Sequence, residues 1–365
     1  MALLAAVCLV APRVAHADTV VLERLRPPAL VGTWYPAEPE TLRATLDGYF
    51  AAVTTPTPTQ RLVAAVVPNA PFGFSGSVAA HAFAGLQPGM YDRVIVISSA
   101  HQAVFEGVSI PNVQAYATPL GVVEVDGAAI NALRYSPQIR IRGLDYSGRA
   151  QHLSVHEREH GIEAVLPFLQ ARLGFFRLVP LVIGQLGDQP TGLERRAAGQ
   201  IAARVQELLD GRTLLVVSTN FTHYGATYGF LPFREGVQAK IEQLDRQIFN
   251  HVLRLQADGM LRFLDENDVP IDGANALYIG MRALAPPLES ELLAYDTSGR
   301  RLGSDQRSVS YAALAFYHPT EPPPEPREAA PRLVRELSDA PRPQVDAPDP
   351  SAPPLQTPTQ AGRDE

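Results

Sequence analysis

Cysteine is almost absent from this chain of 365 residues. Its one cysteine, Cys8, lies within the first apolar stretch. If the chain is cleaved after Ala17, the mature protein contains no cysteine, and this excludes a disulfide, a zinc–thiolate site and a cysteine nucleophile. A cysteine-free chain also suits an oxidising compartment such as the periplasm.

An excess of basic charge is missing as well. The chain has 31 Lys and Arg against 38 Asp and Glu, which gives a net charge of −7 and a pI near 5.8. No basic stripe with interleaved aromatic residues occurs, so we expect no nucleic-acid partner. The apolar stretch at 2–10 is too short to span a bilayer as a helix. We therefore expect no stable membrane insertion once this segment is removed.

The first 17 residues are predicted to form an export signal. The apolar stretch is followed by Ala15, His16 and Ala17, a small-x-small cleavage pattern placed just before Asp18. No Lys or Arg precedes the apolar stretch, which departs from the usual signal, so an untargeted N-terminus is the alternative. The expected product is an exported, periplasmic protein.

Proline dominates the opposite end of the chain. From residue 319 onward the sequence is rich in proline and charge, including a run of three prolines at 322–324. Such a composition cannot bury enough apolar surface to offset chain entropy. We predict a largely disordered tail over 319–365, with a short helix near 332–337.

Between 28 and 318 the sequence alternates between apolar runs and amphipathic segments. The runs have the length of buried strands, and the segments between them have helical spacing. The predicted strands are 61–67, 93–97, 177–183, 214–218, 290–295 and 308–316. The predicted helices are 77–86, 192–209, 236–255, 259–264 and 272–284. This order predicts one three-layer α/β domain over 28–318, with a mainly parallel or mixed central sheet and helices on both faces.

Histidines and a carboxylate follow several of these elements. His101 and His223 come after predicted strands, and Asp272 begins a predicted helix. The carboxyl ends of strands face the binding crevice in α/β proteins. Two histidines and one carboxylate form the ligand set of open mononuclear iron sites. We therefore predict a metal site of His101, His223 and Asp272, although Asp272 is also explained as a helix N-cap.

Two asparagines follow predicted strands in the same way. Asn69 ends the segment Val66-Val67-Pro68-Asn69, and Asn220 lies in the polar turn before His223. We expect both to contact a bound cofactor. The turn after Asn69 lacks the spacing of a dinucleotide-binding or Walker phosphate loop, so a simple strand-to-helix turn is the alternative.

A third pattern involves histidines spaced by four residues. His156, Glu157 and His160 satisfy the H-E-x-x-H pattern of zinc hydrolases literally. Gly161 and Pro167 follow closely, and a long continuous helix is doubtful there. A zinc hydrolase is therefore the weakest of the functional alternatives.

Taken together, these segments resemble the Memo family, also called AmmeMemoRadiSam system protein B. The fold of that family is similar to the class III extradiol dioxygenases, which use non-haem iron. The resemblance covers most of 28–316. Seven ordered matches carry it: G-x-W-Y at 32–35, P-H-A-G-Y-x-(Y/F)-x-G at 68–76, S-x-A-A-H-A at 77–82, G-P-S-H-H at 98–102, E-H-S-I-E at 159–163, S-S-D-F-x-H-(W/Y)-G at 218–225 and D-S-S-V-S-Y-A-A at 307–313.

The departures from the family pattern fall on the site itself. Asn69 replaces a metal-binding histidine, Asn220 replaces an aspartate, and Asp272 aligns with the cysteine of the family's C-G motif. Of the three metal ligands that the resemblance implies, only His101 persists. His160, Glu163 and His223 also match the family.

The leading prediction is a Memo-like protein with a strand-end cleft that binds a non-haem metal and performs redox or dioxygenase-like chemistry. Fe(II) is favoured over softer copper because Asp272 supplies oxygen where the family has sulfur. His160 with Glu163, or His223, would manage protons. The alternative is a non-catalytic binding module without metal or other cofactor, whose partner is a small molecule or another protein.

Overall fold

The computed structural model describes residues 19–22, 24–54, 58–143, 154–186, 192–327 and 333–336. The predicted signal peptide at 1–17 and most of the chain beyond 327 lie outside these residues, so both predictions stay predictions. Among the described residues, no helix combines the length and the apolar character that crossing a bilayer requires.

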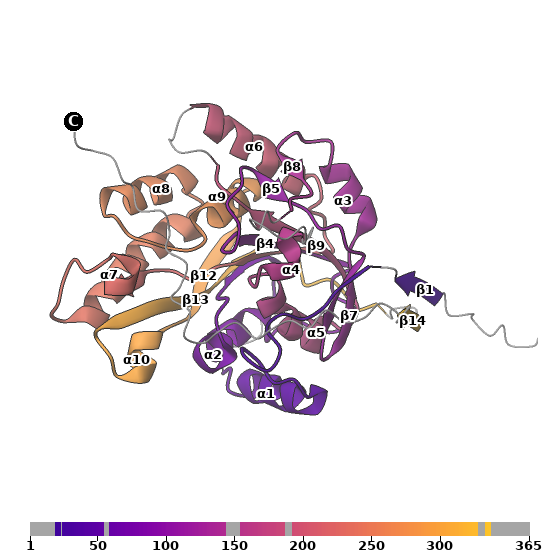
Figure 1. Cartoon of the computed structure of the whole chain (residues 1–365), viewed down its shortest axis with the longest axis horizontal. Coiled ribbons are helices and arrows are strands. Elements are labelled where there is room, and N and C mark those ends of the chain that lie inside the picture. The colour runs from indigo at the N-terminus through magenta and orange to yellow at the C-terminus, as the bar shows by residue number, and fades with distance from the viewer. Residues whose placement is uncertain are drawn as a thin grey trace, which may run out of the picture.

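A nine-stranded mixed sheet forms the centre of the protein (Figure 1). Its four middle strands are parallel to one another: β3 (Leu62–Val67), β10 (Thr213–Ser218), β4 (Arg93–Ser99) and β9 (Arg177–Ile183). They are almost continuously apolar because both of their faces are covered.

Shorter and antiparallel strands extend the sheet on both sides. Strand β13 (Arg307–Tyr317) runs antiparallel to β3 and pairs with β12 (Glu289–Thr297) and β11 (His223–Gly225). Beyond β9 lie β5 (Val108–Ser109) and β8 (Ile139–Arg140). A separate three-stranded sheet contains β2 (Leu25–Arg26), β6 (Ala115–Thr118) and β7 (Gly121–Glu124).

Helices cover both faces of the sheet and complete three layers (Figure 1). One layer contains α1 (Pro39–Ala51), α2 (Phe72–Phe83) and α5 (Leu166–Leu173). The other contains α3 (Gly127–Leu133), α6 (Gly192–Gln206), α7 (Val237–Leu253), α8 (Ala257–Glu266) and α9 (Ala274–Ala283). Successive strand residues point to opposite layers: Ile95 packs into the second core, and Val94 and Val96 into the first.

The predicted fold class is confirmed. Every strand predicted within the domain has a counterpart, whereas the short strands β5 to β8 and helices α1 and α3 were not predicted. Two helix starts were wrong. The helix predicted at 77–86 is α2, which begins at Phe72, and the helix predicted at 272–284 is α9, which begins at Ala274 after Gly273 with no side-chain cap. Asp272 is instead directed at the sheet.

The beginning of the proline-rich tail is ordered against the domain. The backbone N–H of His318 donates to Arg61, that of Arg61 donates to Glu321, and that of Arg327 donates to Gly89. Arg61 also forms an ion pair with Glu321 at 2.7 Å. Further along, the predicted helix near 332–337 is wrong, because β14 (Leu333–Glu336) pairs in parallel with β1 (Thr19–Leu22).

Candidate metal centre

Three parallel strands bring the predicted site residues to one edge of the sheet. Val67 of β3 pairs with Ser218 of β10, which in turn pairs with Ser98 of β4. The loops after these strands carry Asn69, Asn220 and His101, so the shared register places them side by side. The edge is the carboxyl end of the parallel strands, where α/β proteins bind their ligands.

The imidazole of His101 lies between two carboxylates. Its Nδ1 donates to Glu159 Oε2 over 3.2 Å, and its Nε2 lies 3.5 Å from Asp272 Oδ2. This second separation is too long for a well-formed hydrogen bond, and Nε2 is buried without a hydrogen-bond partner. The ring is therefore held at one nitrogen and left open at the other.

Glu159 holds the His101 loop in place. Its Oε1 accepts the backbone N–H groups of His101 and Gln102 at 2.8 and 2.7 Å. Because Oε2 accepts from the His101 ring, both oxygens of this buried carboxylate are engaged. Carboxylates that hold the far nitrogen of a histidine in this way orient metal-binding imidazoles in many proteins.

Asp272 is positioned by the loop after β10. Its Oδ1 accepts from Thr219 Oγ1 at 2.7 Å and from the backbone N–H of Asn220 at 2.8 Å. Its Oδ2 accepts from the amide of Asn220 at 3.0 Å. Gly273 permits this approach, since a Cβ there would lie 2.0 Å from Thr219 Oγ1.

The two asparagines bind each other. The Asn220 amide donates to Asn69 Oδ1 at 2.7 Å, and the Asn69 backbone N–H donates to Asn220 Oδ1 at 3.1 Å. The Asn69 amide donates to the carbonyl of Ser218. The side-chain amides of Asn69 and Asn220 are therefore bonded within the protein and support the loop that holds Asp272. The sequence had predicted that both asparagines contact a cofactor.

His160 brings a second imidazole to His101. The ring centroids lie 4.1 Å apart, and Trp34 packs on His160 at 4.8 Å. Metal-binding atoms of His101, Glu159 and His160 all lie within 4.8 Å of one another. In the described part of the chain, the ring nitrogens of His160 make no hydrogen bond. Gly161 lets the loop that carries His160 approach Ser98 of β4 closely, since a Cβ at position 161 would lie 1.8 Å from Ser98 Oγ.

The charges of this cluster are strongly coupled. Burial alone would lower the pKa of His101, but the carboxylates of Asp272 and Glu159 outweigh it and raise the pKa to about 10. Burial raises the pKa of Asp272, but the contact with His101 lowers it to about 2. Burial and the charge of His101 lower the pKa of His160 to about 3. Without a bound cation, His101 is an imidazolium at neutral pH and His160 is neutral.

His223, predicted as a ligand, lies at the border of the cluster. Its Nδ1 donates to the carbonyl of Phe221 at 2.8 Å, and its ring packs edge-on against Tyr228. Within the described chain, no hydrogen bond or ion pair joins it to His101 or Asp272. Burial lowers its pKa, although the negative charge of Asp272 opposes this.

Glu163, predicted as the acid–base partner of His160, is fully engaged elsewhere. Its buried carboxylate forms an ion pair with Arg26 and accepts from the Tyr35 hydroxyl. It also accepts the backbone N–H groups of Ala29 and Leu30 at 2.8 and 2.9 Å. These contacts fasten the N-terminal segment to the domain and leave no oxygen for His160.

The H-E-x-x-H pattern does not form a zinc site. Helix α4 (Val155–Arg158) is a single turn, so His156 and His160 do not share a helical face. His156 is buried, with Nδ1 bonded to the Tyr116 hydroxyl at 2.7 Å and Nε2 to the Ser109 carbonyl at 2.9 Å. The zinc-hydrolase alternative is therefore wrong, because the required helix is absent and one ligand is already saturated.

Sequence reasoning missed Glu159 and Thr219. Glu159 directly precedes His160 and begins the E-H-S-I-E match, so a signal is present in the sequence, but helical spacing from His160 favours Glu163 instead. Thr219 begins no recognisable motif and carries no charge. Only the hydrogen bond from Thr219 to Asp272 shows that Thr219 helps to position that carboxylate.

Comparison with known proteins identifies the family of this chain. The profile of the Memo-like protein family matches residues 26–315. The chain belongs to the Memo family. It is 31% identical to a MEMO1 family protein of Methanopyrus kandleri over 303 residues, covering 80% of this chain and 98% of that protein. It is 28% identical to the memo-1 homolog of Caenorhabditis elegans over 311 residues, covering 81% and 84%.

Among solved structures, an uncharacterised protein of Escherichia coli K12 aligns with 69% of this chain and 99% of its own, at 14% identity and a TM-score of 0.39. This likeness is too weak to carry an argument.

Proposed function

We propose that this Memo-family protein binds a divalent metal, Fe(II) in preference to copper, at the cluster of His101, Glu159 and His160 beside Asp272, and uses it for redox chemistry on a small molecule. The observation that carries the proposal is the buried Nε2 of His101, which has no hydrogen-bond partner and faces the Asp272 carboxylate. Buried polar atoms are normally satisfied, so an orphaned nitrogen beside a carboxylate favours a missing ligand.

The donor set suits a hard or borderline ion. Two imidazoles and one carboxylate are the ligands of non-haem Fe(II) sites, whereas Cu(I) prefers thiolate or thioether. When bound, Fe(II) would supply binding and activation of dioxygen. In this proposal His160 takes the place of the predicted ligand His223. The His160 ring lies against His101, and its nitrogens make no hydrogen bond within the described residues.

The remaining residues support this centre. Glu159 fixes the His101 ring so that Nε2 points away from the backbone that holds it. Asn220 and Thr219 orient the Asp272 carboxylate. His223, neutral at pH 7 because burial lowers its pKa, is suited to accept a proton from a substrate.

One observation favours the second candidate, a binding module without metal. The protonated His101 ring already lies between two carboxylates, and Asn69 and Asn220 are hydrogen-bonded to each other. Such a cluster is stable without a cation. A metal must displace that proton, so its affinity should rise with pH.

Metal analysis separates the two candidates. The protein would be purified without chelators, loaded anaerobically with Fe(II) and examined by mass spectrometry. We expect near-stoichiometric iron, lost in His101→Ala and Asp272→Ala and retained in His251→Ala, whose histidine lies on α7. No iron after loading would end the metal proposal and leave the binding module.

A further inference from the structure

A cavity of about 190 Å³ lies at the opposite edge of the sheet from His101. It is lined where β3 begins at Leu62, where Tyr91 precedes β4, and where the antiparallel β13 ends at Tyr317. The ends of α1, α2 and α5 complete it. A cavity of about 150 Å³ accommodates a benzene ring, so this one has room for a ring with a small substituent.

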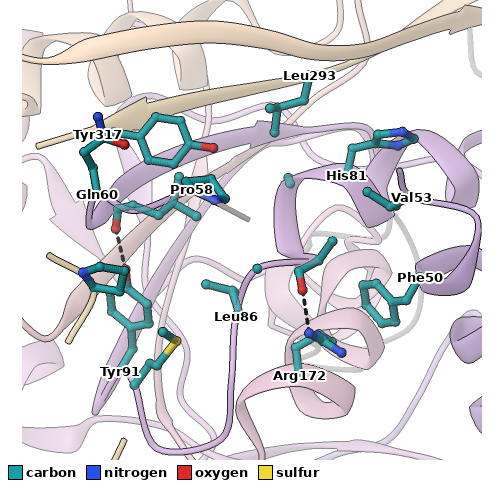
Figure 2. Close-up of a pocket in the computed structure, with 16 residues that line it drawn as sticks. Phe50, Val53, Pro58, Gln60, His81, Leu86, Tyr91, Arg172, Leu293 and Tyr317 are labelled. Carbon is teal, nitrogen blue, oxygen red and sulfur yellow. Dashed lines mark hydrogen bonds between the residues drawn. The ribbon is translucent and has the colours of Figure 1, made fainter. Parts of the chain in front are cut away.

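The cavity wall combines aromatic and apolar side chains with three polar ones, Arg172, His81 and Gln60. Figure 2 shows Arg172 beside Phe50 on one side of the cavity, with Tyr317 and Gln60 on the other. Leu86 contributes apolar surface between them. Aromatic side chains of this kind hold a flat ring through edge and face contacts.

Arg172 is the unusual member of this wall. It donates to the carbonyl of Ala84, and its guanidinium lies 5.0 Å from the centre of the Phe50 ring. Its Nε has no hydrogen-bond partner, and within the described residues it makes no ion pair. Among the described residues no aspartate or glutamate lines the cavity, although Glu289 accepts from Gln60 of its wall at 3.0 Å. Within this part of the chain, Arg172 is therefore held in place without a counter-ion.

A segment beyond the family match closes one side. Pro323 lines the cavity, whereas the Memo match ends at residue 315. The backbone of this segment is held by Arg61 and by Arg212, which donates to the carbonyl of Glu325 at 3.1 Å. The cavity is thus partly built by residues outside the matched family region.

We propose that this cavity binds a small aromatic carboxylate, with the ring among the aromatic side chains and the carboxylate paired with Arg172. A guanidinium that has no counter-ion among the described residues selects for negative charge. The limited volume selects for one ring. This site is separate from the metal centre and does not depend on it.

Fluorine NMR titration of the full chain with 4-fluorophenylacetate tests the proposal, in buffer containing a chelator. We expect saturable binding, and at least about tenfold weaker binding of 4-fluorophenylacetamide, which has the same shape without the charge. Arg172→Gln should bring the two affinities together. Arg43→Gln, which removes an exposed arginine of α1, should leave the difference intact.

Two further variants locate the site. Leu293→Trp and Val53→Trp each fill the cavity from a half-buried position and should weaken binding of the acid at least tenfold. His101→Ala, at the other edge, should bind it normally. Equal wild-type affinity for acid and amide, absence of saturable binding, or full binding in both tryptophan variants would overturn the proposal.

Discussion

Two buried carboxylates four residues apart, Glu159 and Glu163, end in very different surroundings. Glu163 pairs with Arg26, and the described contacts satisfy both of its oxygens. Glu159 is also satisfied, but the histidine it holds keeps one buried nitrogen without a partner. The comparison teaches that charge and burial do not by themselves identify a site. What distinguishes the Glu159 cluster is an unsatisfied imidazole nitrogen beside a carboxylate and a second imidazole.

The largest effect is expected for Glu163→Gln, which leaves Arg26 buried without its counter-ion. Breaking such a pair costs about 3–5 kcal/mol in free energy of unfolding. Urea denaturation measures this. Glu207→Gln removes an exposed ion pair with Arg204 and should change the same quantity by less than about 0.5 kcal/mol. Similar values for the two variants would refute a structural role for Glu163.

Gly161→Ala tests the close packing of the metal-centre loop. The new Cβ would lie 1.8 Å from Ser98 Oγ, so we expect a loss of about 1–3 kcal/mol in the same assay. Gly199→Ala is the control, since nothing lies within 4 Å of a Cβ there and alanine favours its helix. The comparison fails if the two substitutions shift stability in the same direction.

The stability contributions of His101 and His156 should respond to pH with opposite sign. The raised pKa of His101 contributes stability below its unfolded value of about 6.5, and this is lost as pH rises through about 10. Burial lowers the pKa of His156 to about 3, so its contribution is lost as pH falls from about 6.5 toward 3. Each slope is at most about 1.4 kcal/mol per pH unit.

Nitrogen NMR of the metal-free protein checks these assignments directly. At pH 7 the His101 ring should be doubly protonated and the His156 ring neutral. His156→Gln should reduce the acid-side slope of the stability profile, to which His160 also contributes, and leave the alkaline side unchanged. A neutral His101 at pH 7 would contradict the pairing with both carboxylates.

A smaller effect than that of Glu163→Gln is expected for Asp272→Asn in the metal-free protein. His101 loses one of the two carboxylates that raise its pKa, but it keeps Glu159 and can release its proton, so no buried charge is left unpaired. We expect a loss of about 1–3 kcal/mol in free energy of unfolding at pH 7. A loss as large as that of Glu163→Gln would show that both clusters are structural.

The departures from the pattern that the resemblance implies lie together in space. Asn69 and Asn220 stand where the resemblance implies a histidine and an aspartate, and their amides bind each other. The Asp272 carboxylate accepts from the Asn220 amide at 3.0 Å. One negative charge therefore lies beside His101.

By itself the sequence determined the order of strands and helices, because apolar runs and helical spacing are local patterns. It also determined which loops approach the site, because parallel strands end at one edge. It did not separate His160 from His223, or Glu159 from Glu163. Those choices depend on which hydrogen bonds are already satisfied, and that depends on partners such as Arg26 that are distant in sequence. Only the tertiary structure brings those partners together.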